Sequence, residues 1–152
     1  MVSFTEHLLS MQTTQPYNAA VKHPFLCAAG EGTVSAELLS LWLSQDRIYA
    51  AHAYPRFIGS LIAKIPFSSH HELNSLQERE HKRILSCLSF ALQNIVREAD
   101  FFLDTSKDFK LDIICWKERP ETRAYTAEMA RVASHSTLQE GLIFLWAMEK
   151  AR

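Results

Sequence analysis

The chain of 152 residues contains few glycines and prolines, four and five in all. An all-β protein needs many tight turns, which depend on these two residues, so their scarcity argues against that class. No segment reaches the run of about 18 apolar residues that a membrane-spanning helix needs. The N-terminus lacks the basic and apolar regions of a secretory signal peptide. We therefore expect a cytoplasmic protein with no membrane partner.

Cysteine is also scarce, with Cys27, Cys87 and Cys115 far apart and no Cys-x-x-Cys pair. An odd, scattered set argues against a disulfide framework and against a thiolate zinc site. Cys87 stands among apolar residues of a helical pattern, and we expect it to fill the core. The formal net charge of −1 supplies no positive field to hold nucleic acid. We expect no cofactor, no bound metal and no nucleic-acid partner.

Hydrophobic residues make up 47% of the chain and recur with helical spacing, which predicts one all-α domain over residues 1–152. Ser or Thr followed three residues later by Glu is typical of a helix start, and proline favours the first turn. These start signals fall at Ser3, Ser69, Thr137 and Pro120, with a looser one at Ser35. We predict helices over residues 4–21, 35–65, 69–103, 120–134 and 137–152. Residues 104–110 are predicted as a loop, and residues 111–116 as a short strand or helical turn.

The second helix carries a carboxylate, Asp46, on a line of apolar side chains that runs from Leu43 to Ala50 and beyond. Tyr49 lies one turn further along, and Pro55 is expected to kink the helix. A carboxylate on an apolar face is costly unless it is paired, so it is a candidate for a functional site. Asp46 and Tyr49 would suit a nitrogen-rich ligand. The alternative is that Asp46 pairs with Arg56 or points to water.

Two further positions are candidates for chemistry. Glu149 continues the apolar stripe of the last helix and is a candidate general acid or base, although a solvated glutamate is the alternative. The segment from Glu78 to His81 holds one Glu-x-x-His pair, the unit of helical di-iron sites. Since no second copy of that unit exists, a charged, solvated helix turn is favoured.

Several blocks of the chain together resemble the TenA/THI-4 family. They are His23-Pro24-Phe25, Gly30-Glu31-Gly32-Thr33, Leu43-Ser44-Gln45-Asp46-Arg47-Ile48-Tyr49, Ala63-Lys64-Ile65-Pro66, and residues 120–140. The resemblance covers about the first two-thirds of a usual member. It implies a heme-oxygenase-like helical bundle, incomplete within one chain, and a role in thiamin metabolism as a thiaminase II-like hydrolase. It also implies that Asp46, Tyr49 and Tyr125 bind an aminopyrimidine or thiamin-like ligand.

The chain departs from that family pattern at the catalytic end. Met148 stands where the family has a nucleophilic cysteine, and Glu149 beside it is the candidate replacement. The alternatives are an inactive, truncated homologue that binds a small molecule or serves as an oligomeric helical module, and a metal-dependent oxidase using Glu80, His81 and Asp46. Because the last helix is still apolar where the chain stops, we expect the bundle to be completed by self-association into a dimer or tetramer.

Overall fold

The structure, a computed structural model, describes residues 2–11, 17–114 and 116–150. Within these residues every regular element is helical, which confirms the all-α class. The elements are α1 (Phe4–Ser10), α2 (Tyr17–Val21), α3 (Pro24–Gly30), α4 (Ala36–Ile48), the π-helical turn η1 (Tyr49–Ala53), α5 (Tyr54–Ala63), α6 (Leu76–Asp108), α7 (Pro120–His135) and α8 (Leu138–Lys150).

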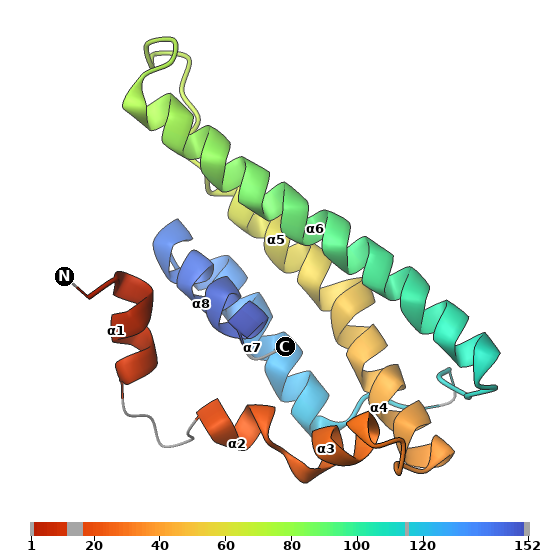
Figure 1. Ribbon diagram of the computed structural model, residues 1–152. Helices are drawn as coiled ribbons and strands as arrows, with labels where there is room; N and C mark the ends of the chain where they lie inside the picture. Colours follow the sequence, from red (N-terminus) through yellow and green to blue (C-terminus); the bar gives the residue numbers. More distant parts are fainter. Residues whose placement is uncertain (1, 12–16, 115, 151–152) are drawn as a thin grey trace.

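A rod made of α4, η1 and α5 forms the centre of the molecule (Figure 1). The long helix α6 packs along one side of this rod, and α7 and α8 pack on another side. The rod contributes the fully buried side chains Phe57, Ile58 and Leu61, and α6 contributes Leu88 and Ile95. Burial of such side chains is the main stabilising term, at roughly 1.5–3 kcal/mol each.

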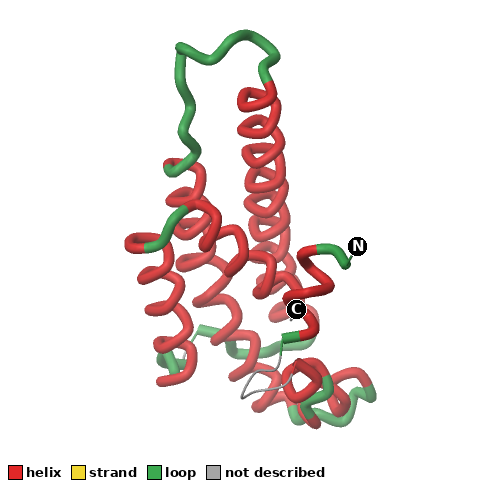
Figure 2. The backbone as a smooth tube through the Cα atoms, turned by 90° about the vertical axis from the view of Figure 1, so that its left-hand side faces the viewer, coloured by secondary structure: helices red, strands yellow, loops and turns green. Residues whose placement is uncertain are grey.

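The first three helices lie outside this core. Neither α1, α2 nor α3 contains a buried residue. One tie to the bundle is the Tyr17 hydroxyl, which donates to the Lys150 carbonyl oxygen at 2.7 Å and so joins α2 to the end of α8. At the opposite end of the molecule, the loop between α5 and α6 projects past the other helices (Figure 2).

The irregularity that we expected at Pro55 is a π-helical turn. Proline has no N–H and its ring clashes with the carbonyl four residues earlier, so a regular helix cannot pass through it unchanged. Here the backbone widens just before Pro55, and the Tyr54 N–H donates to the Tyr49 carbonyl five residues back. The rod thus continues through Pro55 with a change of register at η1.

Most of the predicted helix starts are confirmed. The Ser3 and Glu6 side chains form a reciprocal capping box, Ser35 accepts from the Leu38 N–H, and α7 begins at Pro120. The Thr137 hydroxyl accepts from the Glu140 N–H at 3.3 Å. The start at Ser69 is wrong: α6 begins after Ser75, whose hydroxyl accepts from the Glu78 N–H at 3.2 Å.

Other boundaries also differ from the prediction. The polar residues 104–110 were expected to form a loop, but α6 runs to Asp108, because its buried side chains recur down to Phe102 and the charged end faces solvent. Leu111 and Ile113 are buried in a segment that is neither strand nor helix. The predicted helix 4–21 is α1 and α2, with residues 12–16 outside the described part.

One prediction about a cysteine and one about membranes bear on the fold. Cys87, expected in the core, lies on the exposed side of α6, while Cys115 is outside the described residues. Cys27 lies in α3 and is also exposed. Of the helices described, none combines the length and the apolar character required to cross a lipid bilayer.

Candidate functional site

A pocket of about 410 Å³ opens where α4 and η1 meet α7 and α8. Its lining residues, which we call the tyrosine pocket, are Trp42, Gln45, Asp46, Tyr49, Glu121, Thr122, Tyr125 and Met148. Its size falls in the range of small-molecule sites. Two carboxylates and three aromatic rings line it, and no lysine, arginine or histidine is among those of its lining residues that the structure describes. The pocket is therefore aromatic and negatively charged.

Three tyrosine rings lie in series at this pocket. The ring of Tyr49 lies 5.8 Å from that of Tyr54, edge to face, and 5.4 Å from that of Tyr125 at 43°. In a regular α-helix, residues five apart point in different directions, whereas a π turn places them over one another. The π turn before Pro55 thus brings Tyr49 and Tyr54 together. Tyr54 and Tyr49 are buried, while Tyr125 is 39% exposed.

Carboxylates surround this series of rings. The Tyr54 hydroxyl donates to Glu149 Oε1 at 2.5 Å, a short bond of the kind that an ionised acceptor forms. Partial burial, together with the negative charges of Glu149 and Asp46, raises the pKa of Tyr125 to about 12. Tyr125 therefore keeps its proton at neutral pH. It presents a neutral O–H to the pocket beside two acidic groups.

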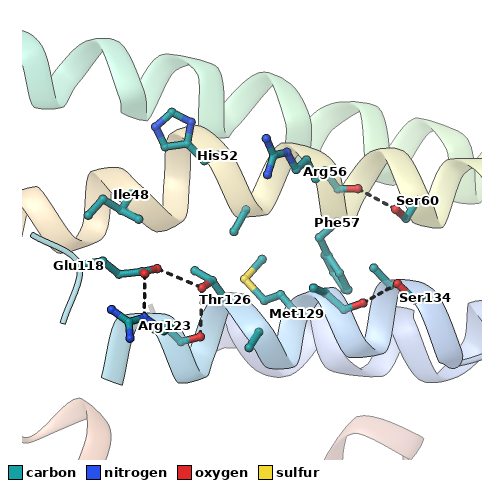
Figure 3. A pocket seen from close by; sticks show the side chains of 14 residues that line it. Ile48, His52, Arg56, Phe57, Ser60, Glu118, Arg123, Thr126, Met129 and Ser134 are labelled. Atoms are coloured by element: carbon teal, nitrogen blue, oxygen red, sulfur yellow. Dashed lines mark hydrogen bonds and ion pairs between the residues drawn. The ribbon is translucent and has the colours of Figure 1, made fainter. Parts of the chain in front are cut away.

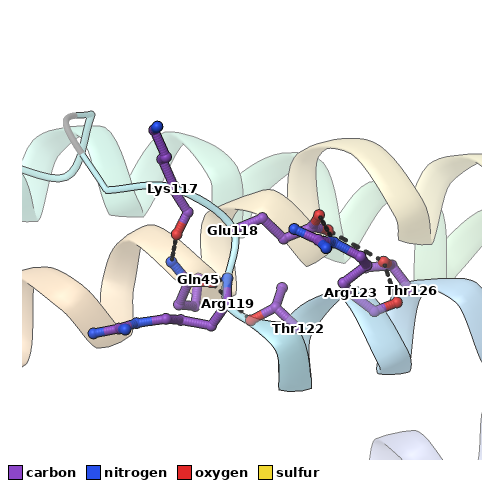
Figure 4. A network of polar contacts seen from close by, with 7 residues as sticks. All are labelled: Gln45, Lys117, Glu118, Arg119, Thr122, Arg123 and Thr126. Atoms are coloured by element: carbon purple, nitrogen blue, oxygen red, sulfur yellow. Dashed lines mark hydrogen bonds and ion pairs between the residues drawn. The ribbon is translucent and has the colours of Figure 1, made fainter.

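Gln45 holds one wall of the pocket in place (Figure 4). Its Nε2 donates to the Lys117 carbonyl oxygen at 3.1 Å, and its Oε1 accepts from the Arg119 N–H at 2.8 Å and from the Thr122 hydroxyl at 2.8 Å. One side chain of α4 thereby fixes both the segment before α7 and the first turn of α7. That turn carries Glu121 and Thr122 into the lining.

A neighbouring pocket of about 520 Å³ continues from the tyrosine pocket, since both are lined by Trp42, Gln45, Glu121 and Thr122. It adds the ring of Phe25 from α3, which lies 5.7 Å from that of Trp42, and it is also lined by Arg119. The N-terminal helices therefore border the site even though they contribute no buried residue to the core.

A different pocket of about 510 Å³ lies between the rod and α7, with Phe57 and Met129 extending into it (Figure 3). Several of its polar groups bond within the protein, while His52 and Arg56 also line it. Arg123 pairs with Glu118 at 3.2 Å, and the hydroxyls of Ser60 and Ser134 donate to carbonyls of their own helices. Since these groups do not converge on its interior, this pocket is a weaker candidate for a ligand.

The proposed metal ligands do not come together. His81 lies near the loop that precedes α6, where its ring is 5.4 Å from that of His71, whereas Asp46 lies at the tyrosine pocket. Glu78 of the Glu-x-x-His pair accepts from the Asn74 N–H and so closes the start of α6. In the part of the chain that the structure describes, no three His, Cys, Asp or Glu side chains are grouped to hold a metal ion. The donor set for a metal-dependent oxidase is therefore missing there.

The sequence-predicted residues Asp46, Tyr49 and Tyr125 meet in one pocket. Glu149 is exposed, yet its carboxylate binds the Tyr54 hydroxyl and acts on Tyr125. Arg56, the alternative partner of Asp46, lines the other pocket. Sequence reasoning missed Tyr54, because a spacing of five is no helical repeat, and it missed the positioning role of Gln45, which depends on a loop 72 residues away.

Together, the fold and this site define an all-helical protein with an acidic, tyrosine-lined pocket. No protein-family model matches the chain, and no solved structure matches it. A protein of Fusarium pseudograminearum (strain CS3096) named "Probable transcription factor" is 33% identical over 149 residues. The matched segment is 97% of this chain and 29% of that protein, so the chain spans less than a third of the relative's length.

These findings overturn the resemblance to the TenA/THI-4 family. No model of that family matches, and the relative carries the name of a transcription factor. The role in thiamin metabolism and the thiaminase II-like hydrolase activity are therefore wrong, and so is the membership of that family on which the alternatives relied. The blocks around Asp46 and Pro120 are short helical patterns, and their amphipathic spacing and capping residues are shared by unrelated helices. The all-α class depends on that spacing alone and is confirmed.

Proposed function

We propose that this chain binds a small organic cation in the tyrosine pocket. The observation that carries the proposal is the composition of the lining, in which, among the described residues, Asp46 and Glu121 lie with Tyr49 and Tyr125 and no lysine, arginine or histidine. A cation gains from carboxylates by Coulomb attraction and from aromatic faces through their quadrupoles. An anion would gain from neither. A flat, nitrogen-bearing cation suits both groups, because its N–H edge can donate to a carboxylate.

The protonated phenol of Tyr125 supports the same ligand class. With its pKa near 12, Tyr125 adds no charge at neutral pH and offers one donor and one acceptor. The two lining carboxylates then dominate the field inside the pocket. Met148, which is buried, supplies a polarisable apolar contact for the body of the ligand.

We infer that this binding serves regulation. The support is the relative named "Probable transcription factor", of which the matched segment is 29%. The net charge of −1 gives this chain no overall positive charge to attract nucleic acid. A ligand-sensing part of a gene-regulatory protein therefore fits the chain better than a part that itself holds DNA.

Benzamidinium and benzamide form a matched pair of probes, because they have nearly the same shape and only the first is charged. Calorimetry or ligand-observed NMR on the full chain should show benzamidinium binding with a dissociation constant of about 1 mM, reasonable for so small a ligand. Benzamide should bind at least about tenfold more weakly, because a charge-assisted hydrogen bond contributes roughly 1.5–3 kcal/mol.

Asp46→Asn should weaken benzamidinium binding by about tenfold while leaving the helical circular dichroism unchanged. Asp100→Asn is the control, since Asp100 is an exposed carboxylate on α6, away from the pocket. Equal affinity for the charged and neutral probes, or equal binding by wild type and Asp46→Asn, would refute the proposal.

A further inference from the structure

The long helix α6 presents two different faces. Leu88, Ile95 and Phe102 recur every seven residues and are buried against the rod. The opposite side is exposed and carries residues spaced three or four apart, which places them in one line along the helix. This line, which we call the outer row, consists of Arg83, Cys87, Phe90, Asn94, Arg97, Phe101, Asp104 and Asp108.

Two large apolar side chains lie in the outer row. Phe90 is 61% exposed and Phe101 is 62% exposed. They are eleven residues apart, which is close to three full turns, so both project from the same side of α6. The two exposed phenylalanines give this face of α6 apolar area that a second helix would bury.

The charges of the outer row are arranged with opposite signs at its two ends. Arg83 lies toward the start of the row, and Asp104 and Asp108 lie at its end, with Phe90 and Phe101 between them. Near the first end, Arg79 and Lys82 add exposed positive charge and Glu80 one negative charge. At the other end, Lys107 pairs with Asp104 at 3.5 Å, and Asp108 adds a further negative charge. A second identical helix laid antiparallel would therefore place opposite charges against each other, and a parallel one would place like charges together.

The spacings in the row are symmetric about one point. A two-fold axis between residues 95 and 96 sets Phe90 of one copy against Phe101 of the other, because both are the same number of residues from the axis. The same axis sets Arg83 against Asp108, and Asn94 against Arg97. Aromatic and ionic pairs thus follow from a single register, and each occurs twice because a two-fold interface repeats every contact.

We propose that the outer row of α6 is the contact surface for a second copy of this chain, packed antiparallel. The proposal does not depend on the ligand of the tyrosine pocket. Only one helix of each copy takes part, so the contact is at the small end of specific interfaces and the dimer is concentration-dependent. Segments of a longer protein or another partner could cover the same face, and the experiment distinguishes them, because they would leave this chain monomeric.

Sedimentation equilibrium over about 1–200 µM should show a monomer–dimer equilibrium for the wild-type chain. Phe90→Ser should weaken dimerisation at least about tenfold, since the substituted contact is lost twice. Phe4→Ser is the matched control, because Phe4 in α1 is also 61% exposed and lies outside the outer row. It should leave the equilibrium unchanged.

Charge exchange tests the register. Arg83→Asp sets two aspartates against each other, and Asp108→Arg sets two arginines against each other, so each should weaken the dimer about tenfold. The double variant should return to within about threefold of the wild type, which a loss of folding would not do. Failure of the double variant to recover would refute the register, and a wild-type monomer at 200 µM would refute the dimer.

Disulfide formation at the native residue Cys87 tests whether the two α6 helices pack antiparallel or parallel. In the antiparallel register Cys87 lies opposite Asp104 of the second copy, whereas a parallel pair would set it against the other Cys87. In a background with Cys27→Ser and Cys115→Ser, which leaves Cys87 as the one native cysteine, Asp104→Cys should form a covalent dimer on mild oxidation. The same background without Asp104→Cys should not, and covalent dimer in that chain would indicate parallel packing.

Discussion

Replacing Gln45 by methionine removes the hydrogen bonds that join α4 to the segment before α7 while keeping the length of the side chain. The bonds lost are those to the Lys117 carbonyl, the Arg119 N–H and the Thr122 hydroxyl. A hydrogen bond contributes about 0.5–1.5 kcal/mol net, and groups left near the surface recover part of this from water. We therefore expect a loss of about 2 kcal/mol in the free energy of unfolding.

That loss corresponds to a fall of about 4–8 °C in the melting temperature for a chain of this size. Thermal and urea unfolding, followed by circular dichroism at the helix band, measure it. Gln93→Met is the control, since Gln93 is an exposed glutamine on α6 and its replacement should change stability by less than about 0.5 kcal/mol.

The role of Gln45 is refuted if Gln45→Met and Gln93→Met unfold within about 0.5 kcal/mol of each other. A second variant tests the network itself. Thr122→Val removes the hydroxyl that donates to Gln45, so combining it with Gln45→Met should cost less than the sum of the two single changes. Strict additivity would show that the two side chains act independently.

Three further predictions concern packing and protonation. Gly141→Ala should lower the free energy of unfolding by about 1 kcal/mol, because a Cβ there would clash with Leu61 Cδ2 and overpacking outweighs the gain in helix propensity. Gly59→Ala, where a Cβ would meet nothing within 4 Å, should raise it by about 0.5–1 kcal/mol; urea unfolding measures both changes. The pKa of Tyr125 is about 12 in the folded chain and about 10 when unfolded. The contribution of its protonated phenol to the free energy of unfolding is therefore complete below pH 10 and is lost as the pH rises toward 12. The stability difference between wild type and Tyr125→Phe should therefore change between pH 9 and 11.5 and stay constant below pH 9. The N–H and hydroxyl of Thr137 lower the pKa of Glu140. The contribution of Glu140 to the free energy of unfolding is therefore present above its unfolded pKa of 4.5 and is lost as the pH falls below that value. The Glu140→Gln variant should lack this loss of stability at acid pH.

The all-helical fold and most helix starts follow from local chemistry. The periodic apolar residues, and the capping groups at Ser3, Ser35 and Thr137, act over three or four residues, so they can be read without knowing the rest of the molecule. The boundary of α6 was mispredicted because Ser69 and Ser75 carry the same kind of signal. Only the packing of the loop before α6 selects between them.

The candidate site was predicted in part for the same reason. Asp46 and Tyr49 are one turn apart, so their proximity is a property of one helix, and their place on an apolar face is visible in the sequence. Tyr54 was not found, because its position over Tyr49 requires the π turn that Pro55 induces. The resemblance to a known family was misleading because it relied on short helical blocks, which many unrelated proteins share.

By itself, therefore, the sequence determined that this chain is helical, where most helices begin, and that Asp46 lies on an apolar face. Only the tertiary structure decided that Asp46, Tyr49 and Tyr125 share a pocket, that Gln45 holds its wall, and that the second face of α6 is exposed. The physical reason is the range of the interactions. Helical spacing and capping act between neighbours in the chain, whereas the pocket depends on contacts between residues about 70 to 100 positions apart, which no local pattern encodes.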